Sequence, residues 1–464
     1  MSGPFAVPSR ETWQAEARRA LKGVEPSSLD RVDADGLGVT ALYAADDGVR
    51  PLFAPRAQDA DGRAWDLRTL VEGDDPALVN AAVLTDLEGG AASVVLAGAV
   101  LADPEPLGRA LAGVALELAP VALDAGLDGP DAANALAVVA KGSPRARLRF
   151  HMDPISAFAE AGGSPRPIAE HLTLAANTGA RHAGAYPEAT FFLASGRVVH
   201  EAGGSAAQEL GFAAASAVAY VTAAIAAGLS TQRALAGTVL SVSVDAEYFD
   251  ALAKVRALRL IWRSISRAFG TEAPATIEAR SSRRMLSARD PWPNLLRLTA
   301  AGFAGAVGGA DTVVLDGFTR ALGHPDAFAR RQARNTQLIL MEEAHLGRVD
   351  DPAAGSWFLD ARTRDLAQAG WAAFQAIQAE GGILAALHAG TIQARVNEAR
   401  IALEATYRDG AKQIVGVTKF VDPDVRPAPV EVSSPARPAD PETRTIVPLS
   451  PIRLSEPFDK ETSA

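Results

Sequence analysis

The sequence predicts an α/β protein built on a (β/α)8 TIM barrel, with an N-terminal extension and an extended C-terminal tail. From about residue 75 onward, short apolar runs alternate with helical runs, as in repeated βα units that form a parallel sheet. An eighth strand is expected around residues 357–359. A doubly wound open sheet is the alternative, but no glycine-rich phosphate loop follows the first strand. The seven clearer strands cover residues 93–98, 121–125, 146–152, 188–194, 239–245, 275–279 and 312–316.

These patterns divide the chain into an N-terminal arm (1–74), the barrel (75–410) and a proline-rich tail (411–464). In the arm, an amphipathic helix begins at Glu11 and ends near Gly23, since glycine commonly terminates helices. The tail is rich in proline and charge and cannot form a core of its own. We therefore expect it to lie extended over another surface or to stay mobile.

Composition excludes several classes of function. The net charge of -10 and the lack of basic runs argue against nucleic acid as a partner. With no cysteine, the chain has no disulfide, no thiolate nucleophile and no thiolate metal site. The N-terminus has no apolar leader, which predicts a cytoplasmic protein. Residues 211–229 carry no charge, but they are mostly alanine, so we expect a buried helix and no membrane span.

Four short motifs follow one another around the last candidate strand. They read GGAD at 308–311, ARNTQ at 333–337, EEAHLGRV at 342–349 and DPAAGSW at 351–357. In this order they resemble the acyl-CoA barrel of the adenosylcobalamin-dependent methylmalonyl-CoA mutase family. The N-terminal helix around Trp13, followed by DGLGVTALY at 35–43, resembles the opening of the family's small, non-catalytic subunits, where this region is an arm that packs against a partner subunit.

The resemblance can be tested at the fourth strand end, because barrel enzymes place their functional residues at C-terminal strand ends. Catalytic members read Ser-Gly-Tyr-His there, and this chain has Arg197 and Val198 at the Tyr and His positions. A valine cannot donate a hydrogen bond or exchange a proton. His200 lies two positions away, and the motif Glu201-Ala202-Gly203 fixes the register, so we expect His200 to be solvated or capped and not catalytic.

After the sixth strand, Arg280 and Arg283 replace an amide and a glycine of catalytic members. They add charge and bulk where a substrate would thread the barrel. Arg197 and Arg280 could bind an anion such as a CoA phosphate, but buried guanidiniums usually have carboxylate partners. We expect an ion-paired interior and no catalytic, cofactor-binding or metal-binding residue. The available carboxylates are Asp153, Asp245 and Glu278.

In the resembling family, adenosylcobalamin binds an Asp-x-His-x-x-Gly loop on a flavodoxin-like domain, and the sequence has neither the loop nor the domain. The resemblance implies that a large catalytic subunit binds the cofactor, and it allows contact with a G-protein chaperone. The chain alone is expected to be silent, within a complex that isomerises methylmalonyl-CoA to succinyl-CoA. One alternative is an acyl-CoA-binding barrel whose cobalamin domain is on a separate small chain. Another is an independent barrel lyase that uses His151 or Asp153.

Overall fold

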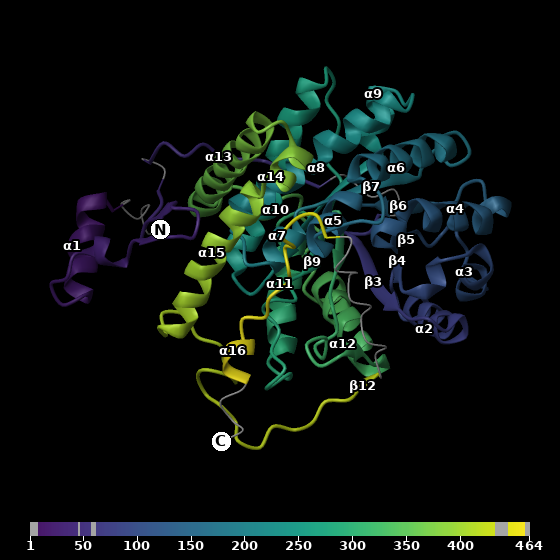
Figure 1. Ribbon diagram of the computed structural model, residues 1–464. Coiled ribbons are helices and arrows are strands. Elements are labelled where there is room, and N and C mark those ends of the chain that lie inside the picture. Colours follow the sequence, from purple (N-terminus) through teal and green to yellow (C-terminus); the bar gives the residue numbers. More distant parts are fainter. Residues whose placement is uncertain (1–7, 45–46, 57–61, 432–443, 460–464) are drawn as a thin grey trace, which may run out of the picture.

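The computed structural model describes residues 8–44, 47–56, 62–431 and 444–459, and its centre is a closed barrel of eight parallel strands. The strands follow one another around the barrel in chain order, and β10 closes it against β3 (Figure 1). This confirms the predicted TIM barrel. Its strands are β3 (Asp66–Glu72), β4 (Ser93–Ala97), β5 (Val121–Asp124), β6 (Leu148–Met152), β7 (Thr190–Ser195), β8 (Thr238–Val244), β9 (Ile277–Ser281) and β10 (Thr312–Val314).

The predicted eighth strand was wrong. Trp357 is the first residue of a 23-residue helix, which Ser356 caps by accepting a hydrogen bond from the Leu359 N–H. The missing strand is β3, inside the stretch assigned to the arm, so the barrel begins before residue 75. This strand has no long apolar run, because Arg68 and Glu72 point polar groups into the barrel while Leu67 and Val71 pack outward.

Helices surround the barrel (Figure 1). Asp75, Asp326 and Ser205 cap the helices that follow them, as their positions before helical runs predict. The main helices are α2 (Pro76–Glu88), α3 (Pro104–Ala110), α4 (Gly129–Val139), α5 (Pro154–Ala161), α6 (Ile168–Ala183), α7 (Arg197–Glu201), α8 (Ala206–Ala226), α9 (Thr231–Ala236), α10 (Tyr248–Ala268), α11 (Asn294–Val307), α12 (Ala327–Leu338), α13 (Trp357–Ala379), α14 (Ile383–Ala389) and α15 (Thr391–Arg408).

Helix α8 is the one described helix that is long and apolar enough to cross a membrane, by length and composition alone. It packs against α13 and the strands β7 and β8, and 67% of its most apolar window is buried within the protein. Small side chains let α8 approach these neighbours closely. At Gly211 of α8, an added Cβ would clash with Ala373 of α13. The helix therefore behaves as a core element here.

The barrel has two separate apolar regions. Large side chains on the outer faces of the strands form the main core with the helices. Inside the barrel, Val95, Ala122 and Val314 form a small layer with Leu70, apart from that core. TIM-barrel interiors are usually filled by several layers of branched apolar residues. The remaining interior positions of this barrel are largely polar, and they form the candidate site.

The arm and the tail differ in how they contact the barrel. In the arm, α1 (Arg10–Ala20) buries no residue, while Asp33 forms an ion pair with Arg362 of α13; the strands β1 (Arg31–Val32) and β2 (Gly38–Val39) form a small hairpin. The described part of the tail includes β12 (Val430–Glu431), which pairs with β11 (His324–Pro325), and α16 (Glu456–Asp459). Residues 444–455 cross the C-terminal mouth of the barrel, in yellow in Figure 1.

Candidate functional site

A charged cluster occupies the barrel axis. Glu278 of β9 is fully buried and accepts hydrogen bonds from two arginines: from Arg68 Nη1 at 2.7 Å and from Arg280 Nε at 2.6 Å. The outer sides of the same arginines contact Asp66 at 2.6 Å and Asp124 at 2.7 Å. The five side chains form a continuous chain of ion pairs that alternates in charge. Arg280 is therefore paired with Glu278, one of the three carboxylates that the sequence analysis considered available.

Burial alone would raise the pKa of Glu278, since a carboxylate loses its hydration. The positive charges of Arg280 and Arg68 outweigh burial and hold that pKa well below its usual range. The same pairing raises the pKa of Arg280 above its usual value, against the effect of burial. Glu278 and Arg280 are therefore both charged at neutral pH.

The cluster separates two cavities. One, of about 600 Å³, lies at the N-terminal end of the barrel and is lined by Arg68 together with Arg56, Arg147 and Arg149. The other, of about 460 Å³, lies at the C-terminal end and is lined by Arg280. A molecule that threaded the whole barrel would have to break the ion pairs of Glu278. The axis is closed by charged side chains that hold one another in place.

The positions expected to be degenerate lie at the C-terminal cavity. Arg197 and Val198 open the short helix α7, directly after β7, and both line this cavity. Val198 is 7% exposed and packs in the main core, so it presents no polar group. Arg283 forms an ion pair with Asp316, Nε to Oδ2 at 3.0 Å. No one of these four sequence-predicted positions brings a proton-transfer group to the cavity.

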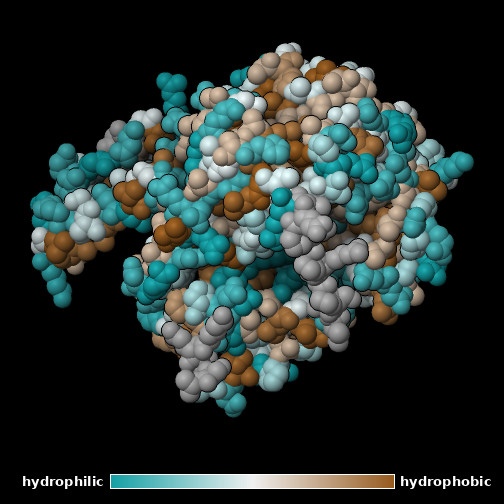
Figure 2. Space-filling view, viewed as in Figure 1, coloured by the Kyte–Doolittle hydropathy of each residue, from teal (hydrophilic) through white to brown (hydrophobic). Residues whose placement is uncertain are grey.

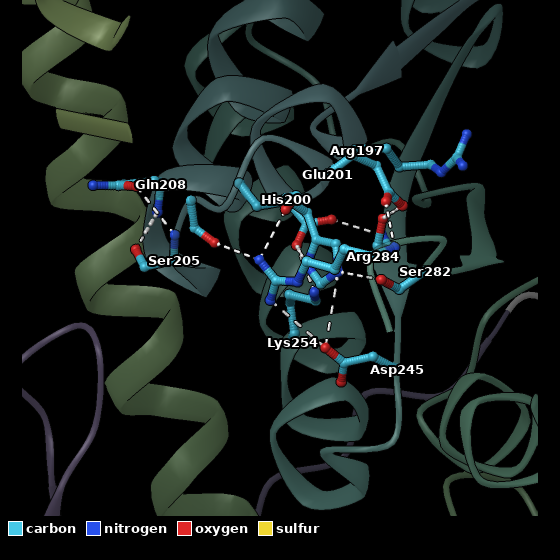
Figure 3. Close-up of polar contacts among 12 residues, drawn as sticks. Arg197, His200, Glu201, Ser205, Gln208, Asp245, Lys254, Ser282 and Arg284 are labelled. Atoms are coloured by element: carbon cyan, nitrogen blue, oxygen red, sulfur yellow. Dashed lines mark hydrogen bonds and ion pairs between the residues drawn. The ribbon is translucent and has the colours of Figure 1, made fainter. Parts of the chain in front are cut away.

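His200 is neither solvated nor an exposed cap, which corrects that expectation. It is 2% exposed, and its Nε2 lies 2.8 Å from Ser282 Oγ. Its Nδ1 lies 3.4 Å from Glu209, which also pairs with Lys254 at 2.5 Å (Figure 3). Burial, followed by the charge of Arg284, lowers the pKa of His200. The imidazole is therefore neutral at pH 7.

Ser282, His200 and Glu209 have the order of a nucleophile, base and orienting acid. Ser282 is fully buried, however, and it lines none of the cavities at the barrel ends. Figure 3 shows His200 and Ser282 with Arg284 and Asp245 beside them. Because no substrate can reach the Ser282 hydroxyl, we interpret the group as a structural link between α7, α8, α10 and β9.

His151 and Asp153 do not form an acid-base pair. His151 has a positive φ of 47° and is 4% exposed, and neither ring nitrogen has a hydrogen-bond partner within the described residues. Burial is the main cause that lowers its pKa, to about 3. Asp153 accepts a hydrogen bond from the Tyr220 hydroxyl at 2.5 Å, and burial raises its pKa to about 6. The lyase hypothesis therefore has no paired acid and base to support it.

Sequence reasoning missed three parts of this region. Arg68 was missed because its strand was not recognised, and Asp124 because its candidate strand read as apolar. Glu72 pairs with Arg320 from the loop after β10, Nη2 to Oε1 at 3.0 Å. The alternation of charged and apolar residues in DLRTLVE at 66–72 was the available signal for an inward-facing charged strand. No group of side chains that could hold a metal ion occurs in the described ranges.

Comparison with known proteins agrees with the fold. A model of the methylmalonyl-CoA mutase family matches residues 58–445. The chain is 39% identical over 457 residues to the methylmalonyl-CoA mutase small subunit of Streptomyces virginiae, which covers 93% of this chain and 73% of that subunit. It is 38% identical to the probable small subunit of Mycobacterium tuberculosis, over 77% of this chain and 61% of the relative.

The small subunit of Propionibacterium freudenreichii subsp. shermanii is 31% identical, over 82% of this chain and 64% of the relative. The chain therefore spans less than two thirds of the length of two of these three relatives.

Proposed function

Because the chain belongs to the methylmalonyl-CoA mutase family, we propose that it is the small, non-catalytic subunit of a heterodimeric mutase that interconverts methylmalonyl-CoA and succinyl-CoA. The observation that carries this proposal is the closed axis. An acyl-CoA that threads the barrel needs an open, hydrogen-bonding interior, and Arg68, Glu278 and Arg280 fill this one with ion pairs. Relatives that are 38–39% identical to the chain are named small subunits, which also supports the proposal.

The family is known to use cobalamin, and the described residues do not fit this cofactor. The cavity at the C-terminal mouth, at about 460 Å³, is much smaller than a corrin with its nucleotide loop. His151, the histidine that lines this cavity, is 4% exposed, so it cannot reach a cobalt ion. We propose that a larger partner subunit binds adenosylcobalamin and carries out the isomerisation.

The arm supports a partner subunit. Its helix α1 buries no side chain against the rest of the chain. Val24, Leu29 and Val32 are 52–70% exposed along the same arm, which stands away from the barrel in Figure 2. A set of apolar residues on a projecting segment is a typical docking element. The partner, rather than this chain's own core, would bury them.

The test combines recovery of the complex with its activity. The tagged chain, purified from its own cells, should bring down a larger protein that carries an Asp-x-His-x-x-Gly loop. Leu29→Asp with Val32→Asp should reduce that recovery, and Leu78→Asp should not, because Leu78 is equally exposed (71%) but lies on α2 of the barrel.

A second experiment tests the proposal that this chain alone has no mutase activity. Arg197→Tyr with Val198→His restores the family's residue types, and we expect no mutase activity from that variant alone with added adenosylcobalamin. Activity without the partner would refute the proposal. The cytoplasmic location and a contact with a G-protein chaperone belong to the same proposal, and recovery of such a chaperone with the complex would support the second.

A second candidate, an acyl-CoA-binding barrel with cobalamin on another chain, has one observation in its favour. Arg56, Arg147 and Arg149 gather at the N-terminal cavity, where they could hold phosphate groups. Arg149 is already engaged with the Glu188 carbonyl at 2.6 Å. Saturable binding of an acyl-CoA by the isolated chain, together with recovery of a small cobalamin-binding partner, would favour this candidate over the first.

A further inference from the structure

The cavity at the C-terminal mouth of the barrel has walls from six strands and a cover from the tail. Its floor includes Arg280, Asp124 and His151, and its side includes Arg197. Leu449 and Pro451 lie across it. This cavity lies above the ion pairs that close the axis, and the proposed function gives it no role.

Three donor groups around this cavity lack partners within the described part of the chain. Arg280 is 4% exposed, and its Nη2 makes no hydrogen bond although its other two nitrogens are paired. His151 is equally buried, with both ring nitrogens unpaired. The Arg197 guanidinium has no described hydrogen bond or ion pair, and in Figure 3 it points away from the surrounding network. Buried donors without partners cost free energy unless a ligand or water satisfies them.

Five carboxylates line the cavity, and two of them pair with arginines. Glu72 pairs with Arg320, and Asp124 pairs with Arg280. Glu201 accepts hydrogen bonds from the backbone N–H groups of residues 283 and 284, at 3.1 and 2.9 Å. The remaining two are Asp153, whose pKa is raised to about 6, and Glu160, at the exposed rim.

Three arginines, Arg197, Arg280 and Arg283, line the same cavity. Arg283 is paired with Asp316, whereas Arg197 is not paired. Burial first, and then the like charge of Arg280, lowers the pKa of Arg197. A negative charge placed between Arg197 and Arg280 would relieve this repulsion, and it would meet the Arg197 guanidinium and the unpaired Nη2 of Arg280.

The tail makes a fixed cover. The N–H groups of Leu449, Ile452 and Leu454 donate to the carbonyls of Ala159, Glu201 and Arg284, at 2.8, 2.8 and 2.9 Å. Leu449 is 4% exposed, so it is packed into the rim. The cover excludes bulk water from the guanidiniums below it, which strengthens their interaction with an anion. It also restricts the cavity to small molecules.

We propose that this cavity is a binding site for a small oxyanion, a carboxylate or a phosphate, held between Arg197 and Arg280 beneath residues 449–451. The ligand is separate from any acyl-CoA, because the Arg68–Glu278–Arg280 ion pairs close the axis below it. The neutral His151 supplies one further N–H or lone pair at the floor. Carboxylate and phosphate share the chemistry of bidentate recognition, and the experiment distinguishes them.

The test is calorimetric titration of the full chain with acetate, with inorganic phosphate and with methylammonium. We expect saturable binding of at least one of the two anions and none of methylammonium. Arg197→Ala should weaken that binding by at least about tenfold, the effect of losing a charge-assisted hydrogen bond. Arg197→Lys keeps the charge but loses the planar guanidinium, so its affinity for the anion should lie between those of the wild type and Arg197→Ala.

Arg408→Ala is the matched control, because Arg408 is an exposed arginine at the end of α15, away from the cavity. It should bind as the wild type does. Arg197 has no described partner, so its removal should leave the fold intact, which circular dichroism will verify. The proposal would be overturned if Arg197→Ala and Arg408→Ala weakened anion binding equally. It would also be overturned if the wild type bound no anion saturably, or if it bound methylammonium instead. Amide hydrogen exchange of residues 445–454 should slow in the presence of the bound anion.

Discussion

Replacing Glu278 by glutamine tests whether the axial ion pairs are a coupled unit. The change keeps the shape of the side chain and removes one buried negative charge from between Arg68 and Arg280. Each arginine keeps one carboxylate, Asp66 or Asp124, but both lose the ion pair that joins them through residue 278. Removing one partner of a buried ion pair typically costs about 3–5 kcal/mol, because the remaining charge stays desolvated.

The expected loss can be converted to a melting temperature. Unfolding entropy is roughly 2.1 cal/mol/K per residue, so the whole chain loses about 1 °C for each kcal/mol. Glu278→Gln should therefore melt roughly 3–5 °C below the wild type in scanning calorimetry. Glu105→Gln is the control: its ion pair with Arg109 is on the surface of α3, with side chains 76% and 62% exposed. Such pairs contribute about 0–1 kcal/mol. If Glu278→Gln and Glu105→Gln have the same melting temperature, the axial ion pairs are not a coupled unit.

Two further predictions concern the rim of the C-terminal cavity. The pKa of Asp153 is about 6 in the folded chain and roughly 3.9 when unfolded, so its protonated form stabilises the fold below pH 4 and that stability is lost as the pH rises through 6. Asp153→Asn should gain roughly 2 kcal/mol relative to the wild type between pH 4 and pH 7 in urea unfolding, and an unchanged difference would contradict the assignment. Leu449→Ala removes a buried anchor of the tail, at a cost of about 2–5 kcal/mol. Amide exchange should then accelerate at residues 445–454 and not in β8; uniform acceleration would mean that the tail is part of the global fold.

The strands most easily recognised from the sequence are those that are buried along their whole length. Thr190–Ser195 and Thr238–Val244 are buried at every position, and such runs are recognisable from composition. β3 was missed because its inward face carries Asp66, Arg68 and Glu72, which look like surface residues in a sequence. Arg68 pairs with Asp66 on the same strand, but the contacts of Arg68 with Glu278 and of Glu72 with Arg320 span separations in sequence that no local pattern reveals.

The same reason limits the prediction of the site. Pairing of Arg280 with Glu278 was predictable, because the two residues lie on the same face of one strand, two positions apart. The contact of Glu278 with Arg68 spans 210 residues and required the closed barrel. His200 was misjudged because Ser282 and Glu209, which surround it, come from two other elements. The cover of the mouth by Leu449 also depended on tertiary structure, although an extended tail over a surface was expected.

The polar axis is more easily explained by a changed substrate path than by selection for stability. Ion pairs inside a protein gain little over apolar residues of the same volume, because desolvation offsets most of their attraction. A barrel that needed only stability could extend the apolar layer of Leu70, Val95 and Val314 along the axis. In this barrel, three arginines instead lie at or beside the axis: Arg68, Arg280 and Arg283. Each one pairs with a different carboxylate, which belongs to Asp66, Asp124 and Asp316 respectively. Paired charges also make the closed axis difficult to reopen by mutation. Replacing a single arginine by a small residue leaves its carboxylate unpaired, so no single substitution should reopen the axis without destabilising the fold.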